Sequence, residues 1–499
     1  RSDYDYTFFI PKKIMRWVTI RMTHEISPFA RLVQISTKCW NWFYWFEFLN
    51  MSVGLTLELI SMAQTARGGS FDDAVKIFRM LPCSGMYLST ALIKSYMMVN
   101  HRPVYENLVN EVGNMWPEGM ISDKELAIIE NARKQLLFVI RGYYWCNNAL
   151  LVSFLSPPII ESIKRMLGYD SQMISHFFYW LPFDPFRPVY IDILVAVQTW
   201  QALVVIWCNL CGDLLFFAFL SHITTQFDLL ALKIENLFYV PIDKQLIESY
   251  PLSEHSKQHL RAEVISGILN STEREIINQK ELSEIVLKHQ ALIRLSGDVE
   301  SMFSFALLVN FINSSIIICF CGFCCIVVEK WNEIAYKSFL LTALSQTFFI
   351  CWYGQKLLDS SAGISHALYN CGWYRAPKKV KSSILIMLFR SQKKVSITTY
   401  GFSIISLGSY TNVNMSKIMK NMGFTFSLNR YLYVNQNSNS YINLNLASNL
   451  KIVYYYDTYR LIIALLDGLL CMLLPPAPPP ASGVANIFSA KYSIFQNKL

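Results

Sequence analysis

The feature that most constrains this chain is a series of seven apolar segments, each of a length that suits a membrane-spanning helix. About 20 apolar residues are needed to cross the hydrocarbon core of a bilayer. The segments cover residues 39–63, 77–99, 136–159, 190–220, 302–328 and 338–357, with a weaker seventh at 395–419. Because backbone groups in lipid must be hydrogen-bonded internally, such segments predict helices. We therefore expect an all-α membrane protein with seven transmembrane helices.

The composition supports a membrane protein. Of the residues, 16% are charged and 53% are hydrophobic, whereas a soluble domain carries about 25% charged residues. Part of the net charge of +9 lies in short basic clusters between apolar blocks, such as residues 378–381 and 390–394. Clusters in this position are typical of the cytosolic anchors of membrane spans. We therefore expect contact with membrane lipid and no nucleic-acid partner.

The distribution of Lys and Arg predicts the orientation in the membrane. Most of these residues outside the spans lie in the N-terminal arm and in the loops 100–135, 221–301 and 358–394. Loops rich in Lys and Arg stay in the cytosol. We therefore expect a cytosolic N-terminus, no cleavable signal peptide and, with seven spans, an extracellular C-terminus, which is inverted relative to G-protein-coupled receptors.

These boundaries divide the chain into regions. A cytosolic arm (1–38) precedes spans one to four (39–220), and spans five to seven with a cytosolic anchor region follow at 302–416. Between them lies a long cytosolic loop, 221–301. An apolar pattern of helical period runs through residues 291–305 into the fifth span, so we expect this loop to carry helical extensions of the spans.

Ionisable side chains inside the predicted spans are costly there and are candidates for a functional role. Arg141 and Lys94 lie toward the cytosolic side, where we expect both to extend, or snorkel, to the membrane interface. Glu47, Glu58 and Asp213 are too short to reach an interface, so we expect them to face other helices or water.

No metal, redox or catalytic motif withstands inspection. Four cysteines lie within residues 319–325, but helical spacing separates Cys319 from the other three, so we expect packing residues. His255 and His259 share a helix face, yet two exposed histidines on a polar helix are ordinary. Neither a P-loop nor an H-E-x-x-H or G-x-S-x-G pattern is present. We expect no cofactor and no enzyme activity.

Aromatic and small polar residues gather in the halves of the spans that we place toward the outside. Aromatic walls with a few orienting polar groups are typical of a pocket for a small apolar ligand, although the same residues also serve ordinary helix packing. The candidate ligand-binding residues are Tyr87, Asn147, Phe154, Trp200, Phe339 and Ser345.

Residues 345–374, "SQTFFICWYGQKLLDSSAGISHALYNCGWY", resemble the insect odorant receptor family. The family pattern is an aromatic run, a glycine, a polar helix and a closing A-x-Y-x-x-x-W-Y. "ITTYGFSIISLGSYTNV" (397–413) looks like the start of the family's seventh span, particularly in moths and butterflies, and "FYWLPFDPFRPVY" (178–190) is similar to its outer loop. The residues that match the first pattern are Gly354, Ala367, Tyr369, Trp373 and Tyr374.

The resemblance implies a ligand-gated, nonselective cation channel in the plasma membrane of olfactory sensory neurons. Such a subunit assembles with the odorant co-receptor, as a heterotetramer, and binds a volatile odorant or pheromone. The seventh helices would line the pore. In this chain the start of that helix is expected at Ser406, Leu407, Tyr410 and Val413.

The chain departs from the family after Ser416. Lys417, Lys420 and Asn421 interrupt the apolar run before a bilayer would be crossed. Our hypothesis is that residues 417–499 are an atypical tail that derives from intron read-through or a faulty gene model.

Two alternatives remain open from the sequence. A gustatory receptor would share the topology but usually ends in a T-Y-(apolar)-Q-F motif, and "TTY" at 398–400 lies too early for it. A membrane transporter or enzyme would need an internal repeat or convergent catalytic residues, and neither is visible in the sequence.

Overall fold

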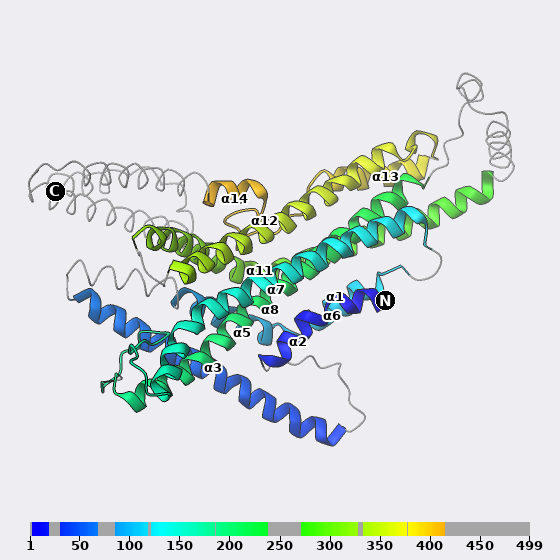
Figure 1. The fold of residues 1–499 in the computed structure, drawn as a ribbon. Coiled ribbons are helices and arrows are strands. Elements are labelled where there is room, and N and C mark those ends of the chain that lie inside the picture. Colours follow the sequence, from blue (N-terminus) through cyan, green and yellow to red (C-terminus); the bar gives the residue numbers. More distant parts are fainter. Residues whose placement is uncertain are drawn as a thin grey trace, which may run out of the picture. The chain divides into compact units, whose positions relative to one another are not determined.

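The computed structural model describes residues 2–18, 30–67, 85–117, 121–184, 186–237, 271–327, 333–376 and 378–414. All of them belong to one unit, Arg1–Met422. Long helices dominate this unit (Figure 1). Its described residues contain no β-strand, and the only β pairing among them is an isolated bridge between Thr398 and Ile404.

Six long or medium helices coincide with the first six predicted spans, which confirms the expected all-α fold. Four of these described helices, α3, α8, α11 and α12, are also apolar enough along their length to cross a membrane. The six are α3 (Ala30–Arg67), α5 (Met86–Asn100), α7 (Asp123–Met166), α8 (Pro188–Glu235), α11 (Ser271–Val327) and α12 (Glu333–Asn370).

Helix α8 forms the centre of the bundle. In its most apolar stretch 89% of the residues are buried, compared with 28% for α3. Helix α8 packs against α12, α7, α5 and α11, whereas α3 contacts α5 and α8 from the periphery. The continuous apolar sequence of α8 follows from this position, because a helix surrounded by neighbours has no face that needs polar residues.

The predicted seventh span begins later than expected. Residues 395–406 are not helical, and α14 (Leu407–Asn414) starts only at Leu407. The non-helical stretch folds back on itself, with the Ile405 N–H donating to the Ile397 carbonyl at 2.9 Å. Gly401 has a positive φ of 80° at the turn, a conformation that glycine adopts without strain. The apolar character of the stretch therefore reflects packing rather than a helix, and residues 415–419 lie outside the described part.

Shorter helices surround the bundle. Helices α1 (Ser2–Thr7) and α2 (Phe9–Trp17) belong to the N-terminal arm, α6 (Arg102–Asn114) follows α5, and η2 (Trp373–Arg375) and α13 (Lys378–Ser391) follow α12. The arm docks against α8: Phe8 is fully buried, and its ring stacks on His222 at 5.4 Å between centroids. The region that we expected as a cytosolic arm is thus in part an integral piece of the fold.

The expected long cytosolic loop is helical at both ends. Helix α8 continues to Glu235, and α11 begins at Ser271, far ahead of the predicted span start at residue 302. This agrees with helical extensions of the spans. His255 and His259 lie outside the described residues, as do the side chains of three of the four clustered cysteines, whereas Cys321 is buried in α11.

Helix α7 contains two prolines near its end and leads into a non-helical loop. Pro157 and Pro158 lie inside this helix and have no N–H, so the carbonyl groups four residues earlier lose their helical donors. The loop 167–187 follows, and its described residues are not helical. The Trp180 N–H donates to the Leu57 carbonyl of α3 at 3.3 Å. Arg165, at the end of α7, pairs with Asp192 of α8 at 2.8 Å and donates to the Gln172 carbonyl of the loop at 3.1 Å.

Candidate ligand-binding site

Three of the predicted ligand-binding residues meet in one aromatic cluster. Tyr87 of α5 lies with its ring centroid 5.2 Å from that of Phe339 of α12, and Phe339 lies 5.6 Å from Phe154 of α7. Phe177, from the loop 167–187, contacts Phe154 at 5.6 Å. The rings meet edge to face or tilted, the arrangements that aromatic pairs prefer. Three helices and a loop thus converge on an aromatic wall.

The other predicted residues lie differently. Asn147 is buried in α7, and its amide donates to the Tyr143 carbonyl at 2.9 Å. Ser345 lies at the interface of α12 with α7, 3.9 Å from the Cys146 sulfur. Trp200 is 54% exposed, and its indole N–H donates to Glu47 of α3 at 2.8 Å. No ring contact joins Trp200 to the aromatic cluster in the described part of the chain.

The loop 167–187 is fixed against α8 beside the aromatic cluster. The side-chain oxygen of Gln198 accepts from the N–H groups of His176 and Phe177 at 2.9 and 3.2 Å, and its amide donates to the Phe177 carbonyl at 2.9 Å. His176 also lies 2.9 Å from the Thr199 hydroxyl. Sequence reasoning noted the aromatic composition of this loop but missed His176 and Gln198, because a contact between a loop and a helix leaves no periodic signal.

Burial determines the protonation state of His176. Desolvation lowers the pKa of its imidazole to about 4, against a weaker opposing effect of the Phe154 carbonyl. That carbonyl has no helical donor because residue 158 is proline. His176 is therefore neutral at physiological pH.

A buried polar network joins four helices. Lys94 of α5 and Asp213 of α8 form an ion pair at 2.6 Å, with 6% and 4% of their side chains exposed. The second carboxylate oxygen of Asp213 accepts from Tyr143 of α7 at 3.0 Å and from Gln346 of α12 at 2.6 Å. The expectation that Lys94 snorkels is therefore wrong, because a buried carboxylate on the adjacent helix satisfies its charge. Arg141, in contrast, is exposed.

The acidic residues of the spans face other helices, as predicted. Asp213 belongs to the network, and Glu47 accepts the bond from Trp200. Glu58 is fully buried in α3, and neither of its carboxylate oxygens has a hydrogen-bond partner among the described residues. A carboxylate in such surroundings is strongly disfavoured as a charged group.

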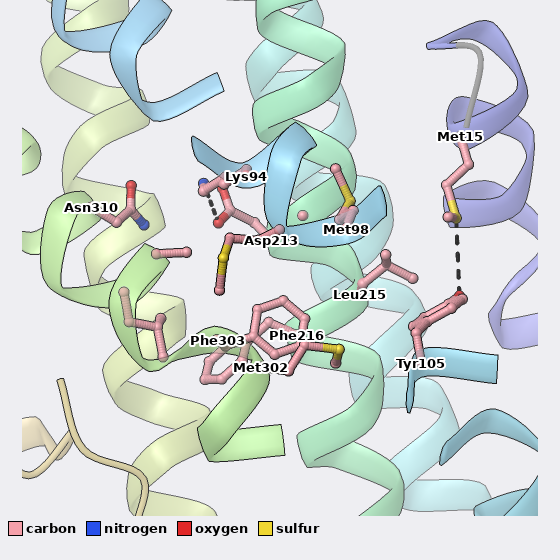
Figure 2. A pocket seen from close by; sticks show the side chains of 14 residues that line it. Met15, Lys94, Met98, Tyr105, Asp213, Leu215, Phe216, Met302, Phe303 and Asn310 are labelled. Atoms are coloured by element: carbon pink, nitrogen blue, oxygen red, sulfur yellow. Dashed lines mark hydrogen bonds and ion pairs between the residues drawn. The ribbon is translucent and has the colours of Figure 1, made fainter. Parts of the chain in front are cut away.

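A cavity of about 30 Å³ lies beside the ion pair, where α2, α5, α6, α8 and α11 meet (Figure 2). That space suffices for about two water molecules. Most lining residues are apolar, and four of them are methionines. Sequence reasoning missed this cavity because its walls come from five separate elements. The lining residues are Met15, Lys94, Met97, Met98, Tyr105, Gly212, Asp213, Leu215, Phe216, Met302, Phe303, Ala306, Leu307 and Asn310.

The motif residues of α12 lie along one helix and its end. Gly354 packs directly against Ile405 of the non-helical stretch, Ala367 is buried, and Tyr369 is 68% exposed. Helix α12 ends at Asn370, after which Gly372 adopts a φ of 71° and leads into η2, which contains Trp373 and Tyr374.

The residues expected at the start of the pore helix lie at the beginning of α14. Ser406 precedes the helix, and its hydroxyl accepts from the Ser409 N–H at 3.2 Å. Leu407 is the first helical residue, and Val413 lies in the second turn. The ring of Tyr410 contacts Phe348 of α12 at 5.7 Å. Helix α12 therefore contacts both the aromatic cluster and α14.

Comparison of the sequence with known proteins identifies odorant receptors as its relatives. A family model described as 7tm Odorant receptor matches residues 79–416. Odorant receptor 67c of Drosophila melanogaster is 26% identical over 375 residues, which cover 73% of this chain and 83% of that receptor. Odorant receptor 85c of the same species is 23% identical over 407 residues, which cover 78% and 91%. These relatives are receptors and not enzymes.

A solved structure shares the fold. The insect olfactory receptor OR5 from Machilis hrabei, in complex with eugenol, aligns with a TM-score of 0.66 at 14% identity, over 85% of this chain and 100% of that chain. The family match ends at residue 416, the position after which the sequence departs from the family pattern. Because the family model covers more than half of the chain, the protein belongs to the 7tm odorant receptor family.

Proposed function

We propose that the protein is the odorant-binding subunit of a ligand-gated, nonselective cation channel that it forms with the odorant co-receptor. The observation that carries this proposal is the convergence of Tyr87, Phe154 and Phe339 from three helices, next to a fixed loop, within the region of the family match. Membership of the odorant receptor family supplies the class of ligand, a small volatile molecule.

The aromatic cluster suits a ligand of mainly apolar character. Ring faces and edges contact an apolar molecule favourably, and few polar groups are needed to orient it. Ser345 of α12 and Asn147 of α7, on two of the helices that form the cluster, are the polar candidates for that role. Trp200 is the weakest of the six candidates, because its indole faces α3.

Helix α12 is the element that would transmit binding to the pore. Phe339 of this helix contacts the aromatic cluster, and Phe348, nine residues on, contacts Tyr410 of α14. A ligand that binds more tightly to the open arrangement shifts the population toward it. A shift of α12 would then move α14, and a hydrophobic constriction of the pore would open by wetting.

The membrane setting follows from the same family. The relatives are odorant receptors, and four described helices are long and apolar enough to span a bilayer. The basic loops favour a cytosolic N-terminus. We place the protein in the plasma membrane of olfactory sensory neurons, as a heterotetramer with the co-receptor.

Electrical recording tests this proposal. The full chain is expressed in cells with and without the odorant co-receptor, and currents are recorded during application of a panel of volatiles. We expect cation currents only with the co-receptor present. Normal surface expression without current to any volatile would contradict the proposal.

A matched pair of variants on α7 tests the location of the site. Phe154→Leu removes a ring of the aromatic cluster, and we expect the concentration for half-maximal current to rise about tenfold, since an aromatic contact and its buried area contribute about 1–2 kcal/mol. Phe138, on the same helix, is 77% exposed, so Phe138→Leu serves as the control and should leave the response unchanged.

A further inference from the structure

The cavity beside the ion pair is separate from the aromatic cluster. None of its lining residues belongs to that cluster, and its walls include the N-terminal helix α2 and the short helix α6, which do not contribute to the cluster. The polar side chains of Lys94, Asp213 and Asn310 line it. Their hydrogen bonds indicate which kind of molecule the cavity can hold.

Asn310 is a buried amide that lines the cavity. Its residue is 3% exposed, and its side chain makes no hydrogen bond to any described residue. Asn313, one turn further along α11, donates to Thr90 at 2.6 Å. A buried amide that lacks its hydrogen bonds is destabilising, so an occupant of the cavity that bonds to Asn310 would be stabilised.

Lys94 has hydrogen-bonding capacity to spare. Its ammonium carries three donors, and among the described residues it bonds to Asp213 alone, at 2.6 Å. Figure 2 shows the ammonium and the Asn310 amide in the part of the cavity away from Met15 and Tyr105. The cavity therefore has one polar end that offers N–H donors.

The rest of the wall is apolar and adaptable. Met97, Met98 and Met302 line it together with Phe216 and Phe303. Methionine side chains rotate about three bonds and adjust to the shape of a neighbour. The 30 Å³ found here suits about two water molecules, and a small organic molecule would enter as the methionines move aside.

The charge balance narrows the class of ligand. Lys94 and Asp213 neutralise each other, so a charged guest would leave an uncompensated charge in a buried site, which is strongly unfavourable. Lys94 offers donors alone, and the Asn310 amide offers a donor as well as an acceptor, so an acceptor on the guest is the group that can bond to both residues. We propose that this cavity is a second binding site, which takes a small neutral molecule that carries a carbonyl oxygen on an apolar body.

Occupation of this site would act on the binding helices through Asp213. The carboxylate of Asp213 also holds Tyr143 of α7 and Gln346 of α12, the helices that carry Phe154 and Phe339. A guest that bonds to Lys94 changes the strength of that network. We therefore expect a guest in the second site to change the strength of the response to an odorant, and not to activate the channel by itself.

The first test is a binding measurement that does not depend on channel activity. The full chain is purified in lipid nanodiscs with isotope-labelled methionine methyl groups, and cyclopentanone is titrated against their nuclear magnetic resonances. We expect saturable shifts of the Met97, Met98 and Met302 methyl signals, with Met387 of α13 unshifted as internal control. If those three signals do not move, the cavity holds water only, and the proposal is wrong.

The second test compares cyclopentanone with cyclopentane, which has the same shape but no acceptor. Asn310→Leu keeps the approximate size of the side chain and removes its amide, the donors and the acceptor together. We expect the preference for the ketone over the hydrocarbon to fall about 3- to 10-fold in this variant, as the loss of one hydrogen bond predicts. Ala306→Val, which fills part of the cavity, should weaken both probes.

The control for the second test is Phe154→Leu, which should change neither the affinity nor the preference. An unchanged preference in Asn310→Leu would overturn the assignment of the polar end. Because the readout is binding, a receptor that gives no current would contradict the proposed channel function while leaving this site standing.

Discussion

At the scale of single residues, the buried ion pair between Lys94 and Asp213 predicts a large effect of substitution on stability. Removal of one partner leaves the other charge buried without compensation, which destabilises a protein by about 3–5 kcal/mol. We expect Lys94→Met and Asp213→Asn each to lower the apparent unfolding temperature of the purified receptor. The double variant should recover most of the loss, because asparagine still accepts from Tyr143 and Gln346 and no charge remains.

Thermal unfolding in detergent, followed for all four proteins of this cycle, measures the coupling between the two residues. Additive losses in the double variant would show that the pair does not act as a unit.

The lowered pKa of His176 predicts that the stability of the loop 167–187 depends on pH. Its pKa is lowered from 6.5 to about 4 in the folded protein, so the folded loop resists protonation. Above pH 6.5 neither state binds the proton, and stability is constant. As the pH falls from 6.5 toward 4, only the opened loop is protonated, and the folded loop loses up to about 3 kcal/mol.

Hydrogen exchange of the loop 167–187 at pH 5 and pH 7 checks this prediction. Opening should be more frequent at pH 5 in the natural protein, after correction for the intrinsic rate. His176→Gln should remove most of that difference, and an equal pH dependence in the variant would assign the effect to another group.

At the scale of elements, two glycines of α12 differ in how closely other residues pack against them. Alanine substitutions at the two positions therefore separate the effect of close packing from the effect of helix propensity. A Cβ atom at Gly354 would lie 2.6 Å from the Ile405 carbonyl oxygen and 2.7 Å from its side chain. Gly354→Ala must therefore displace the stretch 395–406, which leads into α14. We expect this variant to lose most of its odorant-evoked current and about 1–3 kcal/mol of stability, as overpacking does.

Gly363→Ala is the matched control, since it lies on the same helix and a Cβ there meets nothing within 4 Å. It should raise helix stability by up to about 1 kcal/mol and leave the current intact. Equal behaviour of the two variants, in recordings normalised to surface expression, would exclude a specific role for the contact with Ile405.

At the scale of the whole molecule, the family match and the unit boundary nearly coincide. The match ends at residue 416, and the unit that holds every described residue ends at Met422. We expect a chain truncated after Met422 to keep the unfolding temperature and the cyclopentanone affinity of the full chain. A drop in either quantity would show that residues 423–499 contribute to the fold.

Much of the fold could be predicted from the sequence. The first six spans were identified because hydropathy and length are properties of contiguous residues, and lipid leaves a helix as the only satisfactory structure for such a segment. The seventh was placed too early, because residues 395–406 are apolar but turn at Gly401 and pack against α12. Hydropathy does not distinguish a buried turn from a helix.

The candidate binding site was predictable only in part. Tyr87, Phe154 and Phe339 could be proposed from the aromatic composition of their spans, and the structure brings them together. Trp200 fitted the same composition but faces α3. The sequence of a span gives the position of a side chain along the helix. Which neighbouring helix the side chain faces depends on how the helix is rotated in the bundle.

The sequence by itself determined the membrane setting, the helical class and the family, because each of these depends on local patterns and short motifs. Only the tertiary structure decided that Lys94 meets Asp213 across 119 positions of sequence, that Gly354 touches Ile405, and that Asn310 lines a cavity without a hydrogen bond to any described residue. These facts depend on which helix faces pack together. That choice is made by the packing of all the helices at once, and no local stretch of the chain encodes it.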